Sequence, residues 1–230
     1  MAAAAAEAEA ADAISIHERQ RAAILARLPG WYSPVAHLAL PSAFGLACLI
    51  FAAAHIHALR LVELWTIPIT LLAAFGFEWR VHKDLLHKRM PGLELLYDRH
   101  ERSHHIVFTA DDMAMRSRRE MALVLMPWFA IVLVTLVLAP VALLVGWLVS
   151  RNCGLLVLAT GVAFFVSYEW LHLAYHLPAG HPISRLWLVR RLGTFHRIHH
   201  DPPNMRRWNF NVTVPLFDVL HRSLKGDQTH

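Results

Sequence analysis

The chain has 230 residues, of which 56% are hydrophobic, and its mean hydropathy is +0.38. This composition is too apolar for an ordinary soluble domain, and the length suits one membrane domain. Two cysteines exclude a disulfide framework and a cysteine-based metal site, whereas the 17 histidines equal the acidic residues in number. The net charge is +5, but the placement of the basic residues matters more than their sum, and we expect no nucleic-acid partner.

The N-terminal region, residues 1–34, precedes the first long apolar segment. Residues 1–13 lack the basic start and cleavage site of a signal peptide, and we interpret them as a fraying tail. From Ile14 to Leu28 apolar residues are mixed with Glu and Arg, which suits an amphipathic helix on the membrane surface. An ordinary soluble helix is the alternative. We therefore separate 1–34, a tail with a possible interfacial helix, from a membrane domain at 35–230.

Four uncharged segments follow in chain order: Val35–Leu59, Leu64–Phe77, Met121–Ser150 and Asn152–Tyr168. The first has 25 residues, enough to cross a bilayer, whereas the second is short. The third has 30 residues and is either one long tilted helix or a hairpin broken near Pro140. The count is therefore four or five membrane spans.

The placement of Lys and Arg decides between these counts. Nine lie between Arg80 and Arg119, eight follow His172, and three precede residue 35. With four spans these regions share one side, and only Arg60 and Arg151 lie on the other, as the positive-inside rule requires. We predict an all-α integral membrane fold of four transmembrane helices with a cytoplasmic helical cap and cytoplasmic termini. Nineteen Arg against three Lys indicate a bacterial source, hence an inner membrane.

Ten histidines lie in four clusters just outside the apolar segments. The clusters are HKDLLH with His82 and His87, HERSHH with His100, His104 and His105, HLAYH with His172 and His176, and HRIHH with His196, His199 and His200. Helical residues three or four apart share a face, so the last three clusters are each expected to direct their imidazoles at one point. The five-residue spacing in the first cluster predicts a helix end or a local distortion. Ten imidazoles exceed the needs of one ion, so we predict two metal ions with four or five ligands each.

The second cluster also contains the H-E-x-x-H pattern of zinc metalloproteases, in His100, Glu101 and His104. With a third ligand added, that interpretation leaves seven of the ten clustered histidines unexplained. Arg99 and Arg102 also do not suit the apolar helix in which membrane proteases bury this motif. We predict that Glu101 is a solvated carboxylate or one that supports a ligand, and that glutamine in its place leaves metal content and most activity.

From His82 to Asp218 the order and spacing of the four clusters resemble the fatty acid hydroxylase/sterol desaturase superfamily. Two further stretches are similar to family segments, SYEWLHLAYH ending at His176 and NFNVTVPLFDVL at Asn209–Leu220. The chain departs from the family pattern at Asn211, where the family has Gly, and at Phe217, where it has Trp. It departs again at HRS, residues 221–223, where the family has Phe-Gly-Thr. These departures leave the histidines intact.

The resemblance implies a di-iron centre, with two Fe ions on the ten histidines and O2 as co-substrate, that hydroxylates a C–H bond of a membrane lipid. The lipid is an acyl chain, an acyl-lipid or a sterol-like ring, and desaturation at the same site is the alternative. Zinc can replace iron in the isolated protein. Electrons are expected from a separate protein, either a ferredoxin or a cytochrome b5-like protein with its reductase. The oligomeric state is left open.

Carboxylates near the clusters are candidates for holding the ligand imidazoles. Glu169 and Glu78 precede His172 and His82 by about one helical turn, so each is expected to hydrogen-bond the following imidazole. Asp218 matches the acidic position of the family, and Asp201 directly follows the last cluster.

Overall fold

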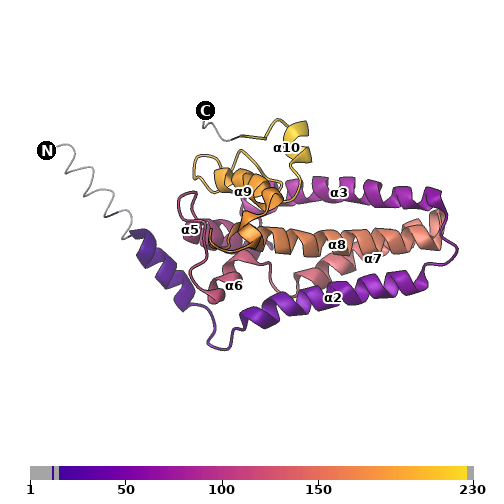
Figure 1. Ribbon diagram of the computed structural model, residues 1–230, viewed down its shortest axis with the longest axis horizontal. Coiled ribbons are helices and arrows are strands. Elements are labelled where there is room, and N and C mark those ends of the chain that lie inside the picture. The colour runs from indigo at the N-terminus through magenta and orange to yellow at the C-terminus, as the bar shows by residue number, and fades with distance from the viewer. Residues whose placement is uncertain (1–11, 13–15, 227–230) are drawn as a thin grey trace.

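The computed structural model describes residues 12 and 16–226, so the predicted tail, apart from residue 12, and Ile14 lie outside the described residues. All regular secondary structure in the described part is helical, and this part contains no β-strand. Figure 1 shows a bundle of long helices on one side and a cap of short helices, with the described N-terminal helix, on the other. The predicted all-α class is confirmed.

Four helices in the described part of the chain are long and apolar enough to cross a membrane. They are α2 (Pro34–His55), the run of η1 (Leu61–Trp65), α3 (Thr66–Val81) and η2 (His82–Leu86), α7 (Ala130–Leu148), and α8 (Arg151–Tyr175). The second and fourth are longer than their uncharged segments because they continue past Glu78 and Glu169, whose side chains are buried. The predicted multi-pass arrangement with four spans agrees with this fold, whereas the cytoplasmic orientation of the cap stays a prediction.

The third uncharged segment is neither of the two forms predicted for it. A short helix, α6 (Met121–Val124), ends at Leu125, and α7 begins only at Ala130. Pro127 lies in the non-helical link, where its ring and missing N–H interrupt helical hydrogen bonding. Pro140, at which a hairpin was considered, is inside a continuous α7. The segment thus gives one membrane span plus one turn of the cap.

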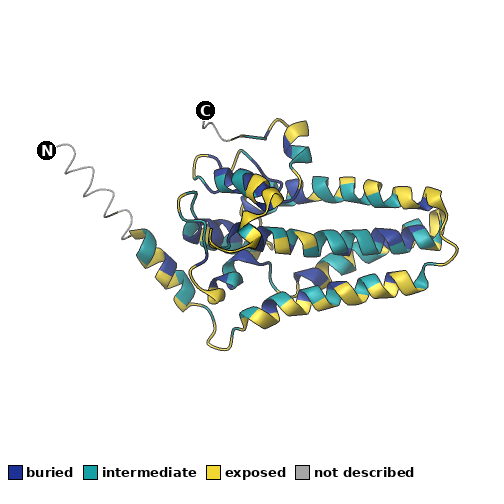
Figure 2. Cartoon of the chain, viewed as in Figure 1, coloured by how far each residue is buried: buried dark blue, intermediate teal, exposed yellow. Residues whose placement is uncertain are grey.

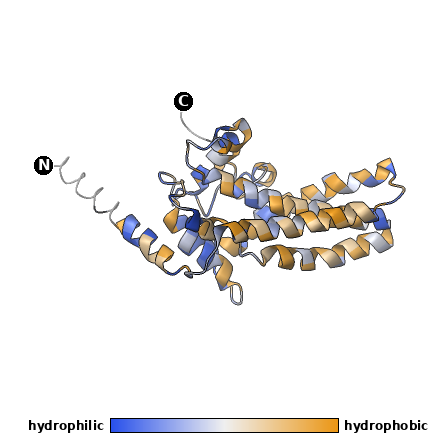
Figure 3. Ribbon diagram, turned by 60° about the horizontal axis from the view of Figure 1, so that its bottom comes forward, coloured by the Kyte–Doolittle hydropathy of each residue, from blue (hydrophilic) through white to orange (hydrophobic). Residues whose placement is uncertain are grey.

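Helix α8 is central to the bundle and packs against α2, α3 and α7. The outward faces of the bundle stay apolar and exposed, for instance at Ile69, Leu136 and Leu143, which are 64%, 63% and 74% exposed. Figure 3 shows the same distribution, with hydrophobic colour along the bundle and hydrophilic colour gathered in the cap. Such surfaces are consistent with contact to lipid, because in water they would associate or aggregate.

The cap consists of short elements that connect and follow the spans. These are α4 (Glu94–Arg99), η3 (His100–His104), α5 (His105–Val107), η4 (Arg118–Glu120), α6, η5 (Ile183–Arg185), α9 (Trp187–His199) and α10 (Leu216–Leu220). In Figure 2 buried segments gather where the cap meets the bundle. The residues buried there are largely polar, and they include all ten clustered histidines.

A helix at residues 16–26 packs on the cap. Its Ile24 contacts the apolar cluster that contains Val107 and Phe108. Its Arg21 is 3% exposed and pairs with Glu120 and Asp112. The predicted amphipathic helix therefore forms, but one of its charged side chains points into the protein. The interfacial position of the helix stays a prediction.

Candidate metal centre

Two π-helical turns carry the first two histidine clusters. In η2 the turn His82–Leu86 is π-helical, and His87 follows it directly. In η3 the turn His100–His104 is π-helical, and the His105 backbone N–H donates to the His100 carbonyl. A π turn closes a hydrogen bond from residue i to i+5, so residues five apart come to one face. The distortion predicted from the HKDLLH spacing is confirmed.

The ten clustered histidines separate into two groups of five buried side chains, each able to hold a metal ion. The first histidine group is His82, His87, His100, His105 and His199, and the second histidine group is His104, His172, His176, His196 and His200. Within each group the candidate ligand atoms all lie within 4.8 Å of one another.

The partition corrects the expectation that each of the last three clusters directs its imidazoles at one point. His100 and His104 belong to different groups because the π turn pairs His100 with His105 instead. His199 likewise points away from His200, into the first group. Of the three clusters expected to do so, HLAYH alone keeps all of its histidines together, as its α-helical spacing predicts, and HKDLLH keeps its two together through the π turn.

Hydrogen bonds at Nδ1 orient most of these imidazoles. Five rings have Nδ1 within 2.5–3.1 Å of a backbone carbonyl oxygen, namely His82 at Phe210, His104 at Leu123, His176 at Met113, His199 at Trp208 and His200 at Phe108. The sixth, His87, has Nδ1 2.8 Å from Oε2 of Glu101. A carbonyl or carboxylate oxygen only accepts, so Nδ1 must donate and Nε2 keeps its lone pair.

The Nε2 atoms converge at distances that suit a shared metal ion. In the first group Nε2 of His100 lies 2.8 Å from that of His82 and 3.1 Å from that of His105. In the second group Nε2 of His200 lies 3.1 Å from that of His104 and 3.0 Å from that of His196. Two nitrogens bound at about 2.1 Å and at right angles to one ion are about 3.0 Å apart. The donor sets therefore fit two ions bound by imidazole nitrogen.

The imidazoles of the cap are held in the neutral form that metal binding requires. Burial, reinforced by neighbouring imidazoles, lowers the pKa well below the usual range for His100, His104, His105, His176, His196, His199 and His200. Burial also lowers the pKa of His87, against the opposing effect of Glu101. A neutral ring has a free lone pair for a cation, so no proton competes with the metal near neutral pH.

The comparison with known families agrees with this geometry. The model of the fatty acid hydroxylase family matches residues 67–223, which include every histidine of both groups. The chain belongs to the fatty acid hydroxylase family. This family lies within the superfamily that the histidine spacings resemble. No match is found among the curated proteins or among the solved structures.

In this fatty acid hydroxylase family member, Glu78 and Asp218 act on the histidines through the backbone. Glu78 accepts hydrogen bonds from the backbone N–H groups of Val212 and Thr213, at 2.6 and 2.9 Å. It does not form the hydrogen bond to the His82 ring that the sequence predicted. Asp218 accepts from the N–H groups of Phe210 and Asn211, at 3.0 and 2.8 Å. Both carboxylates thereby hold the segment whose Phe210 carbonyl orients His82.

Glu169 has a different partner from the one predicted. Its Oε2 accepts from the backbone N–H of Met126 at 3.0 Å, in the non-helical link before α7, and Oε1 has no hydrogen-bond partner among the described residues. It thus satisfies a donor freed by the helix break and does not bond His172. Asp201 accepts from Asn204 at 2.8 Å, in the turn after α9, and likewise contacts no histidine of the centre.

Glu101 is the carboxylate that does bond a histidine of the centre. Burial raises its pKa, but hydrogen bonds from His87 and Arg206 outweigh this effect and lower the pKa to about 2. Arg206 donates from Nε to Oε1 at 3.0 Å and is itself largely exposed. The protease arrangement is not formed, because His100 and His104 lie in different groups. The sequence contained no signal for Arg206, which is 105 residues from Glu101.

The departures from the family pattern are accommodated locally. The Asn211 side chain donates to the Phe75 carbonyl at 2.9 Å and ties the segment to α3. The Phe217 ring covers Gly76, where an added Cβ would lie 2.7 Å from it. Arg222 stands at the family's Gly position and has φ of +55°, a conformation that glycine favours. The turn after α10 therefore keeps a glycine-like backbone without the glycine.

A narrow cavity touches both groups. It reaches His100 of the first group and His172 of the second. Its other lining residues are mainly apolar: Leu86, Leu96, Arg99, Leu123, Val124, Leu125, Met126, Pro127 and Tyr168. The free volume is about 20 Å³, room for about one water molecule. We refer to this space as the leucine-lined cavity.

Proposed function

We propose that this chain hydroxylates a C–H bond of a membrane lipid, using O2 and two iron ions, one in each histidine group. The observation that carries the proposal is the pair of adjacent five-imidazole groups at the end of a lipid-facing helix bundle. Rings from the two groups stack directly, with the centroids of His105 and His200 4.2 Å apart. Imidazole nitrogen is a good ligand for iron as well as for zinc.

The protein's own task in this reaction is to hold, orient and shield. When bound, the two ions supply the redox chemistry that activates O2 and inserts one of its oxygen atoms into the C–H bond. The anchored Nδ1 atoms keep each Nε2 aimed inward without reorganisation during the reaction. Burial of all ten imidazoles keeps bulk water from the reacting atoms.

The leucine-lined cavity supports a lipid as the substrate. It brings apolar side chains to one histidine of each group, so a methylene held there would lie beside a ring of each group. An acyl chain or a sterol-like ring suits such walls, and either reaches them from the bilayer. Because the free space is about 20 Å³, the side chains that line it must move to admit the lipid.

The reaction also requires a partner. Insertion of one oxygen atom leaves the second to be reduced to water, which takes two electrons and two protons from outside the substrate. We propose a separate electron-donor protein, either a ferredoxin or a cytochrome b5-like protein with its reductase. The centre would face the cytoplasm of a bacterial inner membrane, on the side of the basic loops.

Metal content and lipid mass spectrometry on matched variants test the proposal. The wild type should bind two ions per chain and add one oxygen atom to a lipid of the host membrane. His100→Ala and His104→Ala should each abolish formation of the product. The first should weaken binding of the ion in the first histidine group, and the second should weaken binding of the ion in the second group. His57→Ala, exposed and outside both groups, is the control.

The other outcomes are equally distinct. A loss of two hydrogens in the product would assign desaturation at the same site. A single ion per chain, lost from both variants, would instead support the protease interpretation of His100, Glu101 and His104.

A further inference from the structure

Arg21 is a buried cation that lies outside the region matched by the family, residues 67–223. Its Nη2 lies 2.5 Å from Oε2 of Glu120, and its Nη1 lies 2.9 Å from Oδ2 of Asp112. The same guanidinium donates to the carbonyl of Val107 at 3.3 Å and to that of Ala114 at 3.2 Å. One side chain thus uses its planar fork of donors on four acceptors.

The two carbonyls bound by Arg21 are the ends of a loop that serves the second histidine group. Between them, the Phe108 carbonyl accepts from Nδ1 of His200 at 2.6 Å. The Met113 carbonyl accepts from Nδ1 of His176 at 2.8 Å. The loop at residues 107–114 therefore sets the direction of two of the five imidazoles, and Arg21 holds it at both ends.

We propose that Arg21 is a positioning residue for the metal ion of the second histidine group. It acts through the loop carbonyls and touches neither ligand, so its effect is on the direction of the His176 and His200 rings. The inference rests on the proposed function in one respect, that the second group binds a metal ion. It also means that the N-terminal helix, although outside the matched region, is needed to complete the centre.

The effect is confined to one group because the first group is anchored elsewhere. Its His82 and His199 rings bond the carbonyls of Phe210 and Trp208, which belong to the segment after α9. None of these bonds involves the loop at residues 107–114. Loss of Arg21 would leave the nearly fully buried carboxylate of Glu120 without its cation, and the loop would shift to let water reach it.

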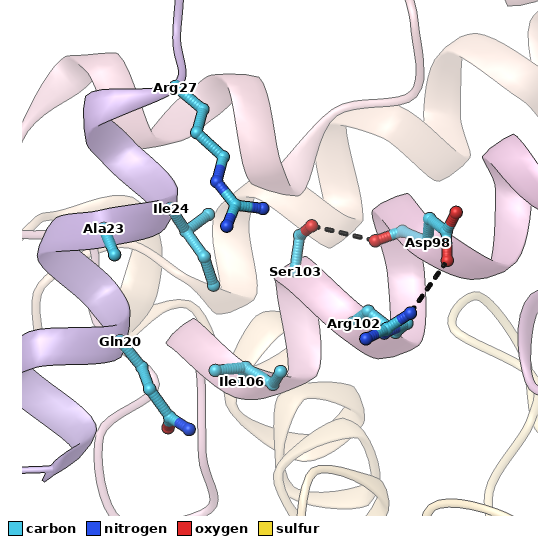
Figure 4. A pocket seen from close by; sticks show the side chains of 8 residues that line it. All are labelled: Gln20, Ala23, Ile24, Arg27, Asp98, Arg102, Ser103 and Ile106. Atoms are coloured by element: carbon cyan, nitrogen blue, oxygen red, sulfur yellow. Dashed lines mark hydrogen bonds and ion pairs between the residues drawn. The ribbon is translucent and has the colours of Figure 1, made fainter.

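The other side of the N-terminal helix provides a matched control. There the helix faces a groove of about 400 Å³ that is also lined by Asp98, Arg102 and Ser103. Figure 4 shows Arg27 reaching into this groove, while Asp98 pairs with Arg102. Arg27 is exposed and directly follows the helix that carries Arg21, but it holds no loop carbonyl of the centre.

The test is a titration of the metal-free full-length protein in detergent with Co²⁺, followed by visible absorption. The wild type should bind two ions with separable spectra. His200→Ala should remove one component and His87→Ala the other, which assigns each to its group. Arg21→Met should weaken the component assigned by His200→Ala by at least about tenfold, since loss of ligand-supporting contacts typically costs 10–100-fold. Arg27→Met should match the wild type.

The outcomes separate this inference from the proposed function. A wild type that does not bind two ions contradicts the proposed function, whatever Arg21 does. Two ions in the wild type with both components unchanged in Arg21→Met, or with the His87 component weakened instead, would overturn the role of Arg21. If Arg21→Met does not fold, Arg21→Lys keeps the charge but cannot reach all four acceptors. It should still weaken the second component alone, and wild-type binding by that variant would equally overturn the inference.

Discussion

At the scale of single residues, backbone carbonyls orient more of the imidazoles than carboxylates do. Five rings are held by carbonyl oxygens, and one, His87, by Glu101. A carbonyl oxygen carries no formal charge, so these five anchors would leave the positive charge of a bound metal ion undiminished. The carboxylates Glu78 and Asp218 lie one step further out and hold the carbonyl-bearing segment in place.

Glu101→Gln should weaken the binding of a metal ion to the first histidine group. The contact with His87 revises the expectation from the sequence that this variant keeps its metal content. Glutamine can still accept from His87 but loses the charge that pairs with Arg206, so affinity for one of the two ions should fall by about 10-fold or more. Competition with a chelator measures it. Glu94→Gln, a carboxylate outside the centre, serves as the control, and equal affinities in the two variants would contradict the role of Glu101.

Arg222→Gly should stabilise the protein. Arg222 has φ of +55°, a conformation that costs a residue with a side chain about 1–2 kcal/mol and costs glycine little. Part of this gain is offset by the larger entropy of glycine in the unfolded chain, so we expect about 0.5–1 kcal/mol. Thermal unfolding in detergent measures the change. Arg222→Ala keeps the strained backbone, and a similar gain in that variant would show that the side chain, not φ, is responsible.

At the scale of elements, the two π turns decide which histidines meet. An α-helical turn would bring His100 and His104 to one face, whereas the π turn of η3 brings His100 and His105 together. The second imidazole of the cluster, His104, is thereby released to the other group. One irregular turn thus lets a single short helical segment contribute to both histidine groups.

Gly154→Ala should destabilise the hairpin of α7 and α8. An added Cβ at this position would lie 2.4 Å from the Ala142 carbonyl oxygen and 2.8 Å from Cα of Gly146, both backbone atoms that cannot turn aside. Overpacking of this kind costs about 1–3 kcal/mol, so the unfolding temperature should fall. Gly180→Ala, with nothing within 4 Å of the added atom, is the matched control. An unchanged unfolding temperature for Gly154→Ala would mean that α7 and α8 can move apart at this position without loss of stability.

At the scale of the whole molecule, α8 links the bundle to the centre. It packs on the other three spans, and its last turns carry Glu169 and His172 out to the cap. The link before α7 is fastened to it by the bond from Met126 to Glu169. The position of the centre at one end of the bundle follows from the length of this helix.

Reporter fusions should show one orientation for all basic regions. Fusions after Lys88 and after Gly180 are expected on the cytoplasmic side, and a fusion near Arg151 on the opposite side, because Lys and Arg are retained in the cytoplasm. Paired reporters, one active in each compartment, measure this. A fusion after Gly180 on the outer side would contradict the four-span arrangement.

The number of spans and the set of ten histidines could be predicted from the sequence because both depend on local patterns. Uncharged runs mark the candidate spans, and the placement of Lys and Arg along the chain decides between four and five. Histidines crowded at spacings of three to five residues predict ligands before any fold is known. The distortion between His82 and His87 was likewise predictable, since five residues do not fit an α-helical face.

Only the tertiary structure decided how the histidines divide into two groups and which hydrogen-bond partners hold their rings. Whether a turn is α or π depends on the packing around it, so the separation of His100 from His104 had no local signal. Backbone carbonyls have no signature in a sequence, which hid the anchors at Phe108 and Phe210. Arg21 contacts partners about 90 residues away, and only folding brings such groups together.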